Sequence, residues 1–257
     1  MTHPKIRFAA LVLWMVFLSL SVAGCNLQPS SGKRPRQTFF VGVDISGSFE
    51  DSGHYDDALT FLSYYIYGHL NNLGGLEEPR ELFVGAIGGE SDNEPKAFHP
   101  IHEFVGKDVE EIEADLRAWF PSNDELTDFN SFFDQVSRIA KERNLVLAPI
   151  TIMLVSDGVP DMKHDVKIGT RETYQQIDFT PLEFLARRLT VRLVYTSPKV
   201  GDNWRKYIDR RRVRLWAVEG EVMEGWHSQL DPKKDLPDQE RFWKWLRDNV
   251  DFRPRSA

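Results

Sequence analysis

The chain has 257 residues, of which 41% are hydrophobic and 28% charged, with a formal net charge of −7 at pH 7 and a single cysteine, Cys25. This acidic balance disfavours the phosphate backbone of DNA or RNA, so we predict no nucleic-acid partner. A single cysteine excludes an internal disulfide. The length beyond the N-terminal region suits one α/β domain with a full hydrophobic core.

The first residues have the pattern of a secretory signal. Lys5 and Arg7 precede an apolar stretch that is too short and wrongly flanked for a stable membrane span, and small residues follow it up to Cys25. We therefore predict that residues 1–24 are a signal peptide. An ordinary signal followed by an incidental thiol is the alternative.

The sequence Val22-Ala23-Gly24-Cys25 resembles the bacterial lipobox. That resemblance implies that Cys25 is lipidated, with palmitate among its acyl chains, and becomes the new N-terminus of a membrane-anchored lipoprotein. Residues 25–37 would then comprise the lipidated cysteine and a flexible tether, because they have no apolar periodicity. The expected location is the bacterial cell envelope. Asn26 favours the outer membrane in a Gram-negative source, whereas a Gram-positive source would place the protein on the outer face of the plasma membrane.

The remaining residues, 38–257, alternate between strand and helix patterns. In chain order we predict a strand at 39–43, a helix at 54–70, strands at 82–87 and, more weakly, 98–105, helices at 109–120 and 129–140, a strand at 150–155, a helix starting with a capping box at Thr180-Pro181, a strand at 191–195, a short helix at 204–211, a strand at 213–218 and a closing helix at 242–250. Such alternation requires crossover connections. The expected fold class is a three-layer, doubly wound α/β domain, Rossmann-like, with a mostly parallel sheet covered by helices on both faces.

Two of the buried strands end in a carboxylate. Asp44 follows the strand at 39–43, and Asp157 follows the strand at 150–155. In open α/β sheets, ligands bind outside the carboxyl ends of the strands. Oxygen side chains without nearby His or Cys suit a hard cation such as Mg²⁺.

Additional hydroxyl residues make the pattern more specific. Asp44-x-Ser46-x-Ser48, then Thr127 ahead of a helix, then Asp157-Gly158, together resemble the metal-ion-dependent adhesion site (MIDAS) of von Willebrand factor A (vWA) domains. The resemblance covers residues 38–218. It implies that Ser46, Ser48 and Thr127 supply hydroxyl ligands and that Asp44 and Asp157 bind the cation directly or through water. Mg²⁺ is the expected ion, with Mn²⁺ and Ca²⁺ as alternatives.

Each part of this pattern also has a simpler interpretation. The Asp44 motif could be turn and helix-cap chemistry, and Thr127 and Asp128 could cap the helix that follows. Leu126 stands where the family often has glycine, so Ser122 and Ser131 remain alternative hydroxyl ligands.

The resemblance implies a binding module and not an enzyme. A protein partner would offer a carboxylate to complete the coordination of the metal, since Mg²⁺ held by few carboxylates stays electrophilic. Two alternatives remain open. One is a metal-assisted hydrolase with His164 or Asp128 as base, and the other is a structural component of an envelope assembly.

Three further features carry less weight. Resemblance to haloacid dehalogenases would require aspartate where Ser46 stands. The run His99-Pro100-Ile101-His102-Glu103 has a spacing that could hold zinc, but a third ligand is not evident nearby in the sequence, so a polar loop or edge strand is the alternative. An acidic cluster is expected to form a solvated loop and helix start, or alternatively to select a basic surface on the partner; its members are Glu50, Asp51, Asp56 and Asp57.

Overall fold

A computed structural model describes residues 36–89, 96–122, 126–146, 148–162, 166–185 and 189–252. Cys25 and His164 lie outside the described residues, as do the predicted signal peptide and most of the predicted tether. The predicted boundaries at 24 and 37 therefore stay predictions. Residues 35–257, taken by themselves, form one compact unit.

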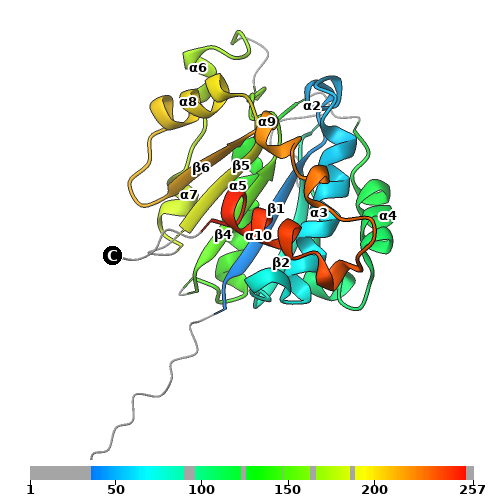
Figure 1. The fold of residues 1–257 in the computed structure, drawn as a ribbon. Helices are drawn as coiled ribbons and strands as arrows, with labels where there is room; N and C mark the ends of the chain where they lie inside the picture. The colour runs from blue at the N-terminus through cyan, green and yellow to red at the C-terminus, as the bar shows by residue number, and fades with distance from the viewer. Residues whose placement is uncertain are drawn as a thin grey trace, which may run out of the picture. The chain divides into compact units, whose positions relative to one another are not determined.

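The centre of this unit is a six-stranded sheet (Figure 1). Its order is β3-β2-β1-β4-β5-β6, and only β3 is antiparallel to its neighbour. The strands are β1 (Thr38–Asp44), β2 (Glu81–Ile87), β3 (Phe98–Pro100), β4 (Ile150–Val155), β5 (Leu189–Thr196) and β6 (Arg214–Glu219). The parallel register places the ends of β1, β2 and β4 at the same edge of the sheet. The predicted α/β class is confirmed.

Helices cover both faces because β1 is apolar on both. Phe39, Val41 and Val43 pack into one core with α3, α4, α9 and α10, whereas Phe40 packs into a second core with α5, α7 and α8. Among the described residues, all buried members of both cores lie within residues 39–250, so this compact unit packs its core from its own segments. The helices are α2 (Gly47–Asp51), α3 (Tyr55–Leu70), α4 (Val109–Trp119), α5 (Phe129–Glu142), α6 (Arg171–Tyr174), α7 (Thr180–Glu183), α8 (Pro198–Tyr207), α9 (Gly220–Met223) and α10 (Glu240–Asn249), with 3₁₀ turns η1 (Leu73–Gly75), η2 (Ile101–Glu103), η3 (His227–Gln229) and η4 (Leu236–Asp238).

The prediction of a capping box at Thr180 was wrong. The helix α7 is a single turn of 4 residues, and its N-cap is Phe179. The carboxylate of Glu183 accepts hydrogen bonds from the backbone N–H groups of Arg211 and Arg212, at 2.6 and 2.8 Å, and not from the helix start. A contact distant in sequence therefore replaces the local one.

The boundaries of two other elements also differ from those predicted. The strand expected at 98–105 ends at Pro100, because proline cannot donate to the strand ladder and the chain turns into η2. The helix expected at 204–211 instead begins at Pro198, where the Ser197 hydroxyl accepts a hydrogen bond from the N–H of Val200 at 3.3 Å. None of the helices in the described ranges is long and apolar enough to cross a membrane.

Candidate metal site

The carboxylate of Asp44 is the buried centre of the candidate site. Asp44 has no exposed surface. The Ser46 N–H donates to its Oδ1 atom at 3.0 Å, and the Ser156 hydroxyl donates to its Oδ2 atom at 2.5 Å. These two hydrogen bonds fix the orientation of the carboxylate at the end of β1.

The two serines after Asp44 lie side by side. Ser46 is the N-cap residue of α2 but makes no side-chain cap hydrogen bond. Its Oγ atom lies instead 3.2 Å from the Oγ atom of Ser48. Ser46 is buried and Ser48 is exposed, so this pair of hydroxyls connects the buried carboxylate with the surface. The helix-cap interpretation is therefore not observed for Ser46, whereas the hydrogen bond from the Ser46 N–H to the Asp44 side chain is the turn that the same alternative predicted.

Thr127 reaches the same edge of the sheet through two isolated bridges. The Leu126 N–H donates to the Gly89 carbonyl at 3.2 Å, just beyond β2, and the Thr127 N–H donates to the Asp161 carbonyl at 2.9 Å, beyond β4. Thr127 is 1% exposed, and its hydroxyl oxygen has no hydrogen-bond partner among the described residues. A buried polar atom of this kind is costly unless something binds it.

The cap of α5 is formed by the next residue, Asp128. Its carboxylate accepts a hydrogen bond from the Ser131 N–H at 3.0 Å. The alternative in which the Thr127 side chain caps this helix is therefore not observed. Ser131 lies in the first turn of α5, and Ser122 lines a separate pocket beside Tyr55.

Asp157 and Ser156 follow β4. The Asp157 Oδ1 atom accepts from the Val159 N–H at 2.8 Å, and the Ser156 oxygen accepts from the Gly158 N–H at 2.8 Å. Ser156, which contacts Asp44, was not among the predicted site residues. The available signal was its place directly after a buried strand, but its contact with Asp44 spans 112 positions of sequence.

Burial dominates the electrostatics of both carboxylates. Burial first, and then the nearby charge of Asp157, raise the pKa of Asp44 to about 7, against the lowering effect of the hydrogen bonds from Ser156 and Ser46. Burial also raises the pKa of Asp157. Two carboxylates that are poorly solvated and close enough to repel each other would be stabilised by a cation between them.

These donors fit a small, hard cation. The described part of the chain contains no group of three or more His, Cys, Asp or Glu side chains that could hold a metal. A cation at this edge would therefore depend on hydroxyls, and the unpartnered Thr127 oxygen is available. Oxygen donors with two carboxylates suit Mg²⁺ better than zinc or copper.

Of the two histidines considered for zinc, His99 has a structural role. The His99 ring stacks on Trp119 with centroids 3.8 Å apart, and its Nδ1 atom lies 2.9 Å from the Glu103 carboxylate. This arrangement holds the turn after β3 against α4.

Fold and site together define an α/β domain with carboxylates and hydroxyls gathered at the carboxyl edge of a parallel sheet. No family model matches the chain, and no curated protein does. Among solved structures, the open form of the pilus adhesin SpaC from Lactobacillus rhamnosus GG matches with a TM-score of 0.46 and 13% identity over 77% of this chain and 30% of the adhesin chain. The VWA domain of SpRpn10 matches with a TM-score of 0.40 and 10% identity over 79% of this chain and 93% of that domain.

A mutant of the PilB minor pilin from Streptococcus sanguinis matches with a TM-score of 0.41 and 10% identity over 84% of this chain and 64% of the pilin chain. This chain thus spans less than a third of the adhesin's length. At these scores the likenesses carry no conclusion about function.

Proposed function

We propose that this protein is a bacterial envelope lipoprotein whose vWA-like domain binds a protein partner through a divalent cation, Mg²⁺ in the first place. Ser46, Ser48 and Thr127 would supply hydroxyl ligands, and Asp44 and Asp157 would supply carboxylates. Lipidated Cys25 would anchor the domain to the membrane, the outer membrane in a Gram-negative source.

The observation that supports this proposal most strongly is the buried Thr127 hydroxyl, which has no hydrogen-bond partner in the part of the chain that the structure describes. It lies at the same sheet edge as Asp44, whose pKa burial and Asp157 raise to about 7. A single cation could accept the Thr127 hydroxyl oxygen as a ligand and also neutralise the charge of the two carboxylates.

The residues around the site have different roles in the proposed binding. The Ser46 N–H and the Ser156 hydroxyl hold the Asp44 carboxylate in place, so little rotamer freedom would be lost on binding. Ser48, being exposed, lies where a partner can approach. When bound, Mg²⁺ supplies an electrophilic contact whose octahedral shell a partner carboxylate can complete.

Removal of the Thr127 hydroxyl should weaken Mg²⁺ binding. Thr127→Val keeps the shape of the side chain, and we expect its Kd for Mg²⁺ to rise at least about tenfold, because a lost ligand costs about 1.4 kcal/mol or more. Isothermal titration of the chain from residue 26 measures this directly. Ser131→Ala and Ser122→Ala are the matched controls, and both should retain the wild-type affinity. Equal affinity in wild type and Thr127→Val would remove Thr127 from the site.

Partner binding should depend on the same metal. Crosslinking and affinity purification from native membranes should recover a partner with wild-type protein in Mg²⁺, and recovery should fall at least about tenfold with chelator or with Thr127→Val. A partner that survives both treatments would indicate a structural role without use of the metal. Chelator-sensitive turnover of phosphoesters or peptides by the purified protein would instead favour the hydrolase.

A further inference from the structure

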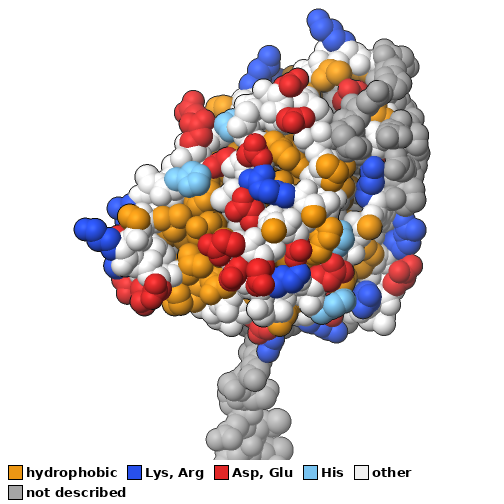
Figure 2. Space-filling model, turned by 90° about the vertical axis from the view of Figure 1, so that its right-hand side faces the viewer, with side chains coloured by type: hydrophobic (Ala, Val, Ile, Leu, Met, Phe, Trp, Pro, Cys, Tyr) orange, Lys and Arg blue, Asp and Glu red, His pale blue; other side chains and the backbone are white. Residues whose placement is uncertain are grey.

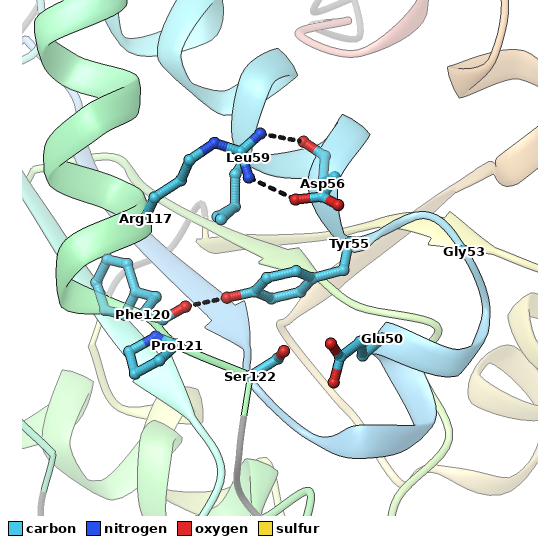
Figure 3. A pocket seen from close by; sticks show the side chains of 9 residues that line it. All are labelled: Glu50, Gly53, Tyr55, Asp56, Leu59, Arg117, Phe120, Pro121 and Ser122. Carbon is cyan, nitrogen blue, oxygen red and sulfur yellow. Dashed lines mark hydrogen bonds and ion pairs between the residues drawn. The ribbon is translucent and has the colours of Figure 1, made fainter.

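A cavity lies beside the candidate metal site. It has a volume of about 300 Å³ and is bordered by α2, the start of α3 and the end of α4 (Figure 3). The aromatic ring of Tyr55 lies across it, with the exposed Pro121 and, behind it, the buried Phe120 among the apolar walls. Figure 3 shows Arg117 and Asp56 on one side of this ring and Glu50 with Ser122 on the other.

Some of the charged side chains that border the cavity form ion pairs, and one forms none with the described residues. Arg117 is bound by two carboxylates: its Nη1 atom donates to Asp56, and its Nη2 atom donates to Glu113 at 2.8 Å. Glu50 is exposed and has no ion pair or side-chain hydrogen bond within the described ranges. One positive charge is thus already shared by two carboxylates, and the lining retains the uncompensated charge of Glu50.

The pKa of Tyr55 also reflects this excess of negative charge around the cavity. Burial first, and then the charge of Glu50, raise the pKa of Tyr55 to about 12, while Arg117 lowers it. The charges of Asp56 and Asp44 contribute in the same direction as Glu50. The cavity therefore lies within electrostatic range of the metal-site carboxylate. Figure 2, which views the side of the molecule where α3 and α4 lie, shows acidic side chains spread over this face.

Glu50 is tied to the metal-site loop through the backbone. Its N–H donates to the Ser46 carbonyl at 3.3 Å, within the single turn that also carries Ser48. A ligand in the cavity and a ligand on the candidate metal would therefore approach the protein side by side.

We propose that this cavity receives a lysine or arginine side chain of the protein partner, next to the carboxylate that the partner gives to the metal. The apolar walls suit the methylene stem, the Tyr55 ring can face the cation, and Glu50 supplies the counter-charge. This inference rests on the proposed function for the identity of the partner. In this proposal Glu50 selects partners with a basic side chain, a role that the other acidic residues of this face do not have.

A probe titration tests the cavity without any metal. Butylammonium chloride is added to ¹⁵N-labelled chain from residue 26 in chelator, and amide shifts of Tyr55 and Ser122 are followed, with butanol as the neutral probe. We expect saturable shifts with butylammonium alone, and Glu50→Gln should weaken binding about threefold to fivefold, as for a pair worth up to about 1 kcal/mol. Asp51→Asn removes the same charge from the same helix outside the cavity and should leave binding unchanged.

Absence of saturable shifts, or equal weakening by Glu50→Gln and Asp51→Asn, would overturn the assignment of the cavity. Failure of Mg²⁺ to bind would overturn the proposed metal site without changing the expected result of this titration.

Selection from a random heptapeptide library on Mg²⁺-loaded protein then tests the partner chemistry. Wild type should enrich peptides with both an acidic and a basic residue, and Glu50→Gln should lose the basic preference while keeping the acidic one. Wild-type enrichment without basic residues would contradict the proposal.

Discussion

Replacing Asp44 with asparagine should stabilise the metal-free protein at pH 8 and have little effect on it at pH 4. Burial and the charge of Asp157 raise the pKa of this carboxyl from 3.8 to about 7. A raised pKa means that the folded state favours the protonated form, so the contribution of Asp44 to stability is fully present below pH 4 and is lost as the pH rises through about 7. Asparagine is neutral throughout, and the gain at pH 8 has an upper value of about 4 kcal/mol.

The measurement is urea unfolding of wild type and Asp44→Asn in chelator between pH 4 and 8, because other titrating groups largely cancel in the difference. Mg²⁺ should reverse the order at pH 8, stabilising wild type and not the variant, since binding of the ion requires the ionised carboxylate. A stability difference that stays constant with pH would show that Asp44 is solvated or paired differently from its position in this structure.

The second large effect is expected at a buried ion pair outside the metal site. Arg192 of β5 is 4% exposed, and its Nη2 atom lies 3.5 Å from the carboxylate of Asp251, which is 3% exposed. The same guanidinium donates to the carbonyl of Val250 and, at 2.9 Å, to that of Phe252. These contacts hold the chain beyond α10 against the sheet. Asp251→Ala should lower the free energy of unfolding by about 3–5 kcal/mol, because it leaves a buried cation without its counter-charge.

Chemical denaturation of the chain from residue 26 gives the stability change. The matched control is the double variant Arg192→Met with Asp251→Leu, which removes both charges and should recover part of the loss, since the buried Val250 carbonyl then lacks its donor. If Asp251→Ala cost less than about 1 kcal/mol, the pair would behave as a surface salt bridge, contrary to its burial.

The local part of the candidate site was accessible from sequence, and the distant part was not. Asp44, Ser46 and Ser48 lie within five positions, so the turn after a buried strand suffices to bring them together. Thr127 was identified only through a family resemblance, and its place at the site depends on bridges to Gly89 and Asp161. Ser156 was missed, since nothing in its own neighbourhood indicates that its hydroxyl would bind Asp44.

Sequence patterns also failed where a distant contact displaced a local one. The capping box at Thr180 did not form because Glu183 binds the backbone of the turn before β6. The shift of α8 has a local cause that was overlooked, namely the Ser197-Pro198 start. Helix and strand types were otherwise predictable because burial of one face imposes a periodicity on each segment.

The sequence by itself determined the alternation of strands and helices, the parallel sheet it requires, and the placement of Asp44 and Asp157 at strand ends, since these follow from local periodicity and from chain connectivity. Only the tertiary structure decided which hydroxyls meet these carboxylates, how strongly burial shifts their protonation, and that a cavity with an uncompensated Glu50 lies beside them. Those properties depend on distances and solvent exclusion among segments far apart in the chain, and no local pattern encodes them.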